Sequence, residues 1–421
     1  MKTKHEMPLL KDHHTHPSIY AVLSNCINIS SIKDKQEALL LIENSKDEIS
    51  VILGWNNSFY CFEDEELDNL PPVVICNISL HSFLINKSAR ETLYHSYEDI
   101  ITHIDDSQWV ERNLYTILKF IAGIKRSDYR LFKSFFDNGL LKSGIWYAED
   151  MLLPNKEILN NFQRIGYLER TKFWADIETI NSLNSEEKHL IHGIKIFTDG
   201  AIGAKTAAIR ECFLTGEKGI LIYSDKQLFI ALTKLSKFDK PIAIHAIGDL
   251  ATDQTIRVLT NIYNSEGCIP QIRIEHCQFI SKENAEKAKS LGIVLSMQPN
   301  FTNDSLQYTD RLPVKYCRIN NPFRMLIDEA GYIPGEDLVF GSDGMPHGIN
   351  YALKQGLFPP FKNQALTLKE FIAGYCMPDK KHGYIEVEID NKQQSIKTKI
   401  VSEYPGSLLP SQVVPDLKPV Y

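Results

Sequence analysis

Short apolar segments recur along the second half of the chain, and stretches with helical spacing separate most of them. The apolar segments cover residues 193–200, 241–249, 271–279, 292–299 and 337–344. Buried parallel strands that alternate with helices are typical of an α/β fold. Each segment ends in polar or ionisable residues, and the carboxyl ends of barrel strands converge on one face. The pattern therefore predicts a (β/α)₈ barrel rather than an open sheet.

The first third of the chain is more mixed. Residues 49–55, 71–80 and 143–151 read as strands, whereas 113–124 and 128–141 have the apolar spacing of helices. Near the start stands the segment KDHHTHP, residues 11–17. Because side chains alternate along a strand, His14 and His16 should point to one side and His13 to the other.

Composition narrows the class of protein. The chain has 421 residues, 43% of them apolar, and a formal net charge of −7. It lacks a block of basic residues and an apolar run of the roughly 18–20 residues that span a bilayer, so we expect no nucleic-acid or membrane partner. Its start does not resemble a signal peptide, and the eight cysteines are scattered without a C-x-x-C pair. These features predict a cytoplasmic protein with reduced thiols.

Four further ionisable residues fall on the apolar segments or at their ends: Lys195, His245, His276 and Asp343. Taken singly, each histidine has an ordinary interpretation as a hydrogen-bonded residue, and Asp343 as a turn former. Lys195 is harder to explain, because a buried lysine without a partner is costly. Imidazole and carboxylate groups suit Zn²⁺ and its first-row neighbours. With His14 and His16, the set predicts a metal site at the barrel mouth.

Several segments, in this order, resemble the amidohydrolase superfamily and, more narrowly, its amidohydrolase-3 (YtcJ-like) branch. The resemblance extends from about residue 12 to 355, and its motifs are DHHTHP, ILGWNNSFY, LHSFLINKSA, GIKIFTDGAIGAKTAA, HAIGDLATDQTI, RIEHCQF, SMQPNF and FGSDGMP.

This resemblance implies a metal-dependent hydrolase on a distorted TIM barrel. His14 and His16 match the pair that binds the more buried metal, and His245 and His276 match the ligands of a second metal. Lys195 matches a lysine that the family carboxylates with CO₂ to bridge the two ions. Asp343 matches the carboxylate that binds metal and shuttles the proton. One or two divalent ions, with Zn²⁺ the first expectation, would activate a hydroxide to cleave an amide-like, non-peptide C–N bond of a small molecule.

Other residues have weaker claims to the site. Asp199 and Asp249 could orient ligands or substrate, or serve as turn and cap residues. Gln298 could contact substrate at the end of its strand. An insertion after the first barrel strand contains His81, Trp55 and Asn86. Substrate binding and packing within the insertion explain these three residues equally well. Arg273 and Glu275 have opposite parity to His276, which predicts a salt bridge outside the site.

The chain also departs from the family's pattern. We expect residues 1–370 to form the barrel, with residues 18–140 as an insertion after its first strand that covers the mouth. Residues 371–421 are expected to form a β-hairpin and tail, because few residues precede His14 and the usual G-K-x-A-D phrase is missing after residue 370. The family's β-sandwich would be absent or reduced to this remnant. Lys87 and the phrase GWNN depart from the usual motifs and predict an altered pocket; a homodimer remains open.

Two alternatives stay open at this point. One is a mononuclear, deaminase-like amidohydrolase, although the phrase HAIGD offers no nearby glutamate for it. The other is a catalytically silent barrel that acts as a binding or regulatory protein. Retention of all six candidate ligands favours the enzyme over the silent barrel.

Overall fold

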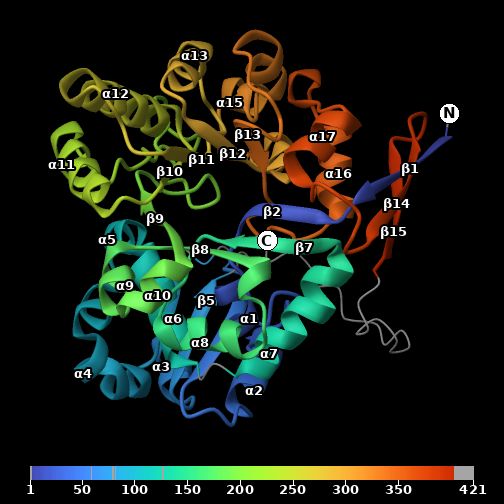
Figure 1. The fold of residues 1–421 in the computed structure, drawn as a ribbon. Helices are drawn as coiled ribbons and strands as arrows, with labels where there is room; N and C mark the ends of the chain where they lie inside the picture. The colour runs from blue at the N-terminus through green and yellow to red at the C-terminus, as the bar shows by residue number, and fades with distance from the viewer. Residues whose placement is uncertain (1, 58, 78–79, 81, 126–127, 403–421) are drawn as a thin grey trace.

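The centre of the molecule is an eight-stranded, nearly closed parallel barrel (Figure 1). The computed structural model describes residues 2–57, 59–77, 80, 82–125 and 128–402. Neighbouring barrel strands follow one another in chain order, as expected for repeated βα units. The strands are β2 (Leu10–Thr15), β7 (Ile145–Asp150), β8 (Thr171–Ala175), β9 (Ile191–Phe197), β10 (Ile242–Ala246), β11 (Ile272–His276), β12 (Val294–Met297) and β13 (Leu338–Phe340). The predicted α/β barrel is thus confirmed.

Strand register explains which side chains face the barrel interior. His245 lies opposite Phe197 on one neighbouring strand and opposite Glu275 on the other. Lys195 lies opposite Ala243, two residues before His245 on the same face. The alternate isoleucines of β10 and β11 belong to the apolar core that packs under the helices. Polar groups therefore point inward and apolar groups outward on these strands.

Helices surround the barrel on its outer side (Figure 1). Their apolar faces cover the outward isoleucines, which is why both faces of the strands are buried. The helices after β7 are α8 (Lys156–Arg164), α9 (Ile177–Ser182), α10 (Ser185–Leu190), α11 (Asp225–Leu235), α12 (Asp249–Glu266), α13 (Lys282–Ser290), α14 (Asp304–Gln307), α15 (Val314–Ile319), α16 (Ile349–Leu357) and α17 (Leu368–Tyr375).

The barrel closes between β2 and the end of β13. The Asp343 amide donates to the His14 carbonyl at 2.6 Å, and the Ser342 amide donates to the Asp12 carboxylate at 2.9 Å. Gly341 permits this approach, since a Cβ there would lie 2.3 Å from the His14 nitrogen. The backbone that closes the barrel is therefore the backbone that carries three of the candidate site residues.

The insertion after β2 forms a separate lobe in the lower half of Figure 1. It contains a four-stranded sheet of β3 (Ile27–Asn28), β4 (Ser50–Trp55), β5 (Val73–Asn77) and β6 (Phe83–Ile85), in that order. One side of this sheet packs in its own apolar cluster, which includes Ile52, Trp55 and Ile75. The helices are α1 (Pro17–Leu23), α2 (Lys35–Glu43), α3 (Asp64–Asp68), α4 (Lys87–His103), α5 (Ser107–Arg112), α6 (Leu114–Ile124) and α7 (Tyr129–Ser134), which a π-helical turn continues over Phe135–Leu140.

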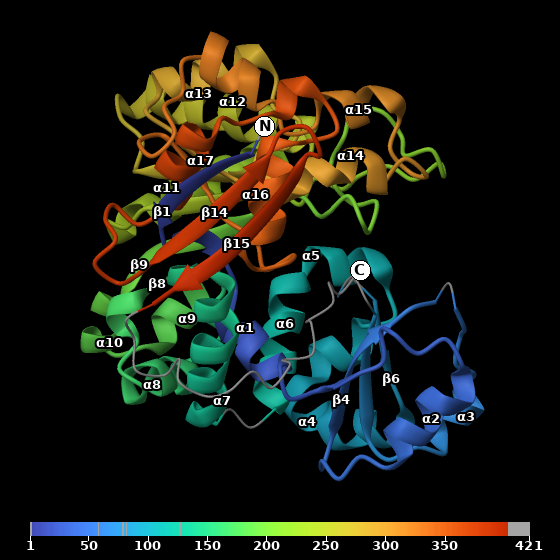
Figure 2. The same ribbon diagram turned by 90° about the vertical axis from the view of Figure 1, so that its right-hand side faces the viewer.

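A small antiparallel sheet stands beside the barrel and faces the viewer in Figure 2. The hairpin expected after residue 383 is present as β14 (Tyr384–Asp390) and β15 (Ser395–Val401). The sequence did not predict its third strand, β1 (Lys2–Pro8), which pairs with β14 from Lys2 opposite Asp390 to Pro8 opposite Tyr384. Our interpretation of this sheet as the remnant of a β-sandwich stays a prediction.

Within the described residues, no helix combines the length and the apolar character needed to cross a bilayer.

Candidate active site

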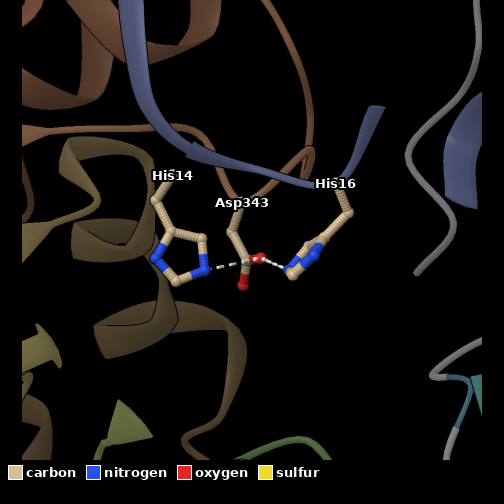
Figure 3. A group of neighbouring side chains, drawn as sticks. All are labelled: His14, His16 and Asp343. Carbon is tan, nitrogen blue, oxygen red and sulfur yellow. Dashed lines mark ion pairs between the residues drawn. The ribbon is translucent and has the colours of Figure 1, made fainter. Parts of the chain in front are cut away.

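His14, His16 and Asp343 lie together at the mouth of the barrel (Figure 3). The Asp343 carboxylate stands between the two imidazoles, with its Oδ1 3.0 Å from His16 Nε2 and 3.5 Å from His14 Nε2. One nitrogen or oxygen from each of the three residues falls within 4.8 Å of the others, which is close enough to share one metal ion. The alternation predicted for the H-x-H segment is therefore present.

The remaining predicted ligands complete the same site. The His276 ring lies 4.7 Å from the His14 ring and 4.5 Å from the His245 ring, measured between centroids. Lys195 joins these rings on the wall of one cavity of about 200 Å³, which all six candidate ligands line. The structure thus gathers six side chains that are spread over more than 300 residues of sequence.

Lys195 is the most unusual member of this group. The residue is 2% exposed, and its Nζ is buried without a hydrogen-bond partner among the described residues. Burial lowers the pKa of Lys195 to about 8, although the Glu275 and Asp343 carboxylates favour its charged form. A buried nitrogen without a partner is expensive in an apoprotein, and it is the group that a carbamate or a metal site would satisfy.

The imidazoles are held in the form that binds metals. Burial, reinforced by the nearby Lys195 and the other histidines, lowers the pKa of both His14 and His276 well below the usual value. Metal ions bind neutral imidazole, so these two rings need not lose a proton at neutral pH. The donor set of imidazoles, one carboxylate and one deprotonatable lysine therefore fits a divalent ion of the Zn²⁺ type.

Two site residues have backbone angles that side-chain-bearing residues rarely adopt. The φ angle is +73° at His276 and +56° at Asp343, both in the left-handed region. Such conformations cost on the order of 1–3 kcal/mol and persist where the surroundings fix them, often at functional sites. At His276 the turn also ends the regular alternation of β11. The His276 side chain lines the cavity although the preceding residue, Glu275, faces the barrel interior and contacts His14.

Glu275 corrects the sequence analysis. The predicted salt bridge exists, with Arg273 Nε 2.5 Å from Glu275 Oε1, but it does not lie outside the site. The other oxygen, Oε2, is 2.6 Å from His14 Nδ1. A carboxylate on Nδ1 fixes the ring orientation and leaves Nε2 for a metal. Parity along β11 misled the prediction because His276, not Glu275, departs from the strand geometry.

A buried network of ion pairs holds Glu275 in its contact with His14. Arg273 also donates to Glu149 Oε2 at 2.7 Å, and Glu149 Oε1 lies 2.9 Å from His13 Nδ1. Burial alone would raise the pKa of Glu149, but Arg273 and His13 hold it well below the usual range. His13, which does not line the cavity, thus has a structural partner of its own.

Two of the weaker candidates lie against the histidines. Asp199 lines the cavity and accepts from the amides of Ile247, Gly248 and Ala208 at 2.8–3.0 Å. Its Oδ1 is 3.5 Å from His245 Nε2, so it can orient that ring. Gln298 was expected to contact substrate; its Oε1 instead lies 2.9 Å from His276 Nδ1, and the residue is not part of the cavity wall.

Three other candidates are occupied elsewhere. Asp249 accepts from the Arg210 amide at 2.9 Å and from the Tyr316 hydroxyl at 3.2 Å, so it ties the start of α12 to the loop after β9 and to α15. Trp55 donates to the Tyr60 carbonyl inside the insertion's core. Asn86 caps α4 and bonds the backbone around residues 67–73. None of the three lines the cavity, and packing rather than substrate binding explains them. His81 lies outside the described residues.

The residues that line the cavity around the predicted ligands were not predicted from the sequence. Helices α5 and α6 of the insertion contribute Arg112, Leu114, Tyr115 and Leu118. The segment after β12 contributes Phe301, Asp304 and Tyr308. These residues follow no metal-ligand pattern and stand on loops and short helices, so only the aromatic and acidic character of "NFTNDSLQY" offered a signal.

Comparisons with known proteins identify the family of the chain. The model of the family described as "Amidohydrolase family" matches residues 126–345. The chain is 30% identical over 142 residues to the protein of Bacillus subtilis (strain 168) named "Putative amidohydrolase YtcJ", which covers 33% of this chain and 26% of that protein. It is also 30% identical over 115 residues to "Protein LONG AFTER FAR-RED 3" of Arabidopsis thaliana, covering 27% of this chain and 20% of that protein. The matches therefore span about a quarter or less of these two relatives.

Solved structures share the fold. An uncharacterized metal-dependent hydrolase from Pyrococcus horikoshii OT3 matches with a TM-score of 0.66 and 22% identity, over 88% of this chain and 80% of that one. Its counterpart from Pyrococcus furiosus matches with a TM-score of 0.65 and 19% identity over the same shares. The family match covers more than half of the chain and includes Lys195, His245, His276 and Asp343. The chain belongs to the amidohydrolase family, in its amidohydrolase-3 branch.

Proposed function

We propose that this protein is a metal-dependent hydrolase that cleaves an amide-like, non-peptide C–N bond of a small molecule. One observation carries the proposal: six potential metal ligands, from four barrel strands and from the segments directly after β2 and β13, line one cavity. The buried, unpartnered Nζ of Lys195 strengthens it, because a barrel that bound no metal would gain nothing from that nitrogen.

The residues divide into two groups around the proposed ions. His14, His16 and Asp343 would hold one ion, and His245 and His276 a second. Neutral Lys195 can add to CO₂, forming an N–C bond and releasing a proton, and the resulting carbamate would offer two oxygens between the ions. Zn²⁺ is our first expectation for the metal. When bound, such ions lower the pKa of water and polarise a carbonyl.

Asp343 is the group placed to handle the proton. Its carboxylate stands between His14 and His16 and faces the cavity, so it can accept a proton from the attacking water. The same oxygen can return the proton to the leaving nitrogen as the C–N bond breaks, which completes the reaction without a change in the enzyme. The positive φ at Asp343 and its amide bond to the His14 carbonyl fix this position.

The surrounding side chains exclude water and orient the ligands. Glu275 and Gln298 hold His14 and His276 through their Nδ1 atoms. Leu114, Leu118 and Phe301 form part of an apolar wall over the site. An apolar wall strengthens the electrostatic interactions within the cavity and limits competing reactions with bulk water.

A mononuclear, deaminase-like reaction is the second candidate. The observation in its favour is that His14, His16 and Asp343 already lie within bonding distance of a single point. A metal-to-protein ratio near one, with an unmodified Lys195, would support this alternative over the two-metal site.

The test is reconstitution of purified protein. We expect chelation to abolish hydrolysis of a panel of formamides, acetamides, cyclic imides and carbamates, and Zn²⁺ to restore it with one or two bound ions. ¹³CO₂ should give a carbamate signal that Lys195→Ala removes, with Lys287→Ala as the control for an exposed lysine. Protein that binds no stoichiometric metal and hydrolyses none of the panel with any first-row ion would refute the proposal.

A further inference from the structure

A carboxylate outside the metal site faces the same cavity. Asp304 begins α14, is half-buried, and lines the cavity with the six candidate ligands. Its Oδ2 accepts a hydrogen bond from Gln278 Nε2 at 3.0 Å. Within the described part of the chain, Asp304 has no lysine, arginine or histidine as an ion-pair partner. The reaction proposed above makes no use of this group.

Neutral side chains hold Asp304 in place. Gln278 Nε2 also donates to Asn320 Oδ1 at 3.0 Å, and Asn320 Nδ2 donates to Ser305 Oγ at 3.1 Å. The carboxylate is therefore anchored through one oxygen to a network that supplies no positive charge. Burial raises the pKa of Asp304 to about 7, as expected for an acid that lacks a countercharge.

Aromatic rings complete this side of the cavity. Phe301, Tyr308 and Tyr351 belong to the same wall. Burial, followed by the charge of Asp304, raises the pKa of Tyr308, so the phenol and the carboxylate share one environment. Aromatic faces attract ammonium and guanidinium groups, and a half-buried carboxylate pairs with the same cations.

Arg112 is the competing charge on the wall. It would favour an anionic substrate, but it belongs to α5 of the insertion and its residue is exposed. Exposed charges contribute little to binding because water and salt screen them. Asp304 is more deeply placed and fixed by a hydrogen bond, so it should decide the charge preference.

We propose that the substrate carries a cationic group, an ammonium or a guanidinium, which Asp304 and its aromatic neighbours bind while the amide faces the metal site. This inference deepens the proposed function and rests on it. It makes Asp304 a specificity-determining residue.

The experiment compares three probes that share one acetamide and one ring. They are the N-acetyl derivative of 4-(aminomethyl)benzylamine, which is cationic, N-acetyl-4-methylbenzylamine, which is neutral, and 4-(acetamidomethyl)benzoate, which is anionic. With Zn²⁺-reconstituted protein at pH 8, we expect kcat/KM and calorimetric affinity to favour the cation about 10-fold or more. Asp304→Asn, which keeps the Gln278 bond, should remove that preference.

Asp310→Asn serves as the control, because it removes an equal charge from an exposed acid that pairs with Arg311. It should leave the preference intact. Equal binding of the cationic and neutral probes, failure of the cationic probe to bind, or a preference for the anion that Arg112→Gln removes would each overturn the inference. Asp304-dependent binding of the cation without hydrolysis of any probe would instead count against the proposed function alone.

Discussion

The barrel and the insertion differ in how their polar residues are used. All six candidate ligands lie on barrel strands or in the segments directly after β2 and β13, and the ion pairs beneath them tie β2, β7 and β11 together. The insertion buries its own apolar cluster around β4 and β5 and touches the cavity through α5 and α6. The barrel is therefore built to hold charge in one geometry, whereas the insertion shapes the space above it.

This difference separates two kinds of variation. Changes in the side chains that α5 and α6 present to the cavity can alter its wall without replacing a ligand. Only one side of the insertion's sheet has a separate apolar cluster, and its other side and its helices share the main core with the barrel. Changes in the barrel interior affect ligands, ion pairs and strand closure together. Variants of the two regions should consequently differ in which measured quantity they alter.

The largest effect should follow from loss of the proposed proton carrier. We expect Asp343→Asn to lower kcat by about 10²–10⁴-fold, because general acid–base catalysis contributes on that order. Steady-state kinetics and metal analysis of the reconstituted protein measure it. The insertion control Asp106→Asn, at the start of α5, should keep kcat within a few-fold. Similar losses in both variants would contradict the division of roles.

The Glu275–His14 contact should control metal affinity. Glu275→Gln leaves an oxygen for His14 Nδ1 but removes the negative charge, so we expect about 10–100-fold weaker Zn²⁺ binding. Competition with a fluorescent chelator reports this independently of activity. Glu283→Gln on the exposed surface of α13 is the matched control. Unchanged affinity in Glu275→Gln would show that the carboxylate only balances Arg273.

Replacing one glycine in each region by alanine should change the free energy of unfolding in opposite directions. In Gly341→Ala the new methyl would lie 2.3 Å from the His14 nitrogen at the barrel closure, so we expect a loss of about 1–3 kcal/mol together with weaker metal binding. Gly139 lies in the helical turn Phe135–Leu140, where a Cβ meets only the Phe135 ring at 3.5 Å or more. There Ala should stabilise the protein by about 0.5–1 kcal/mol. Denaturant unfolding measures both.

An apolar change in the insertion should affect substrate binding alone. Leu118 is half-buried in α6 and lines the cavity, so Leu118→Ala should raise KM by about 3–10-fold with kcat and zinc content unchanged. Steady-state kinetics on the best amide of the panel provides the test. A fall in zinc content would mean that the insertion also supports the ligands.

The smallest effect concerns pH and stability. The pKa of Asp304 is about 7 in the folded protein against 3.8 in a solvated reference, so its folded form favours the proton. Its contribution to stability is present below pH 4 and is lost as pH rises through 7. Compared with the unsubstituted protein, Asp304→Asn should therefore raise Tm more at pH 8 than at pH 5. The difference should be on the order of 1–2 °C for a chain of this size. An equal change at both pH values would indicate a structural role.

Much of the fold and the core of the site could be predicted because strand ends carry their own signal. A polar residue at the end of an apolar run marks the mouth of a barrel, and that rule located His245, His276 and Asp343. Lys195 was located by a different signal, since a lysine within an apolar strand is costly to bury. Glu275 was misplaced because a positive φ at His276 is not visible in an alternation pattern. Trp55 and Asn86 stand in motif-like segments, but their polar atoms bond the backbone nearby.

The cavity wall and the β1–β14 pairing could not be predicted for a different reason. Both depend on segments far apart in the chain: Lys2 pairs with Asp390, and Arg112 and Asp304 line the same cavity. Local spacing carries no information about which distant loop or strand will be the neighbour. Asp304 in particular has the sequence context of an ordinary helix start.

The pairing of β1 with β14 has a consequence for biosynthesis. One residue, Leu9, separates β1 from the strand that bears His14 and His16, yet the partner of β1 begins at Tyr384. At about 5–20 residues per second, a ribosome needs tens of seconds to supply that partner. We expect the strand that carries the first candidate ligand to lack this neighbouring strand for most of translation. Uptake of the proposed ion would then follow chain release, and chaperones have reason to shield the nascent barrel.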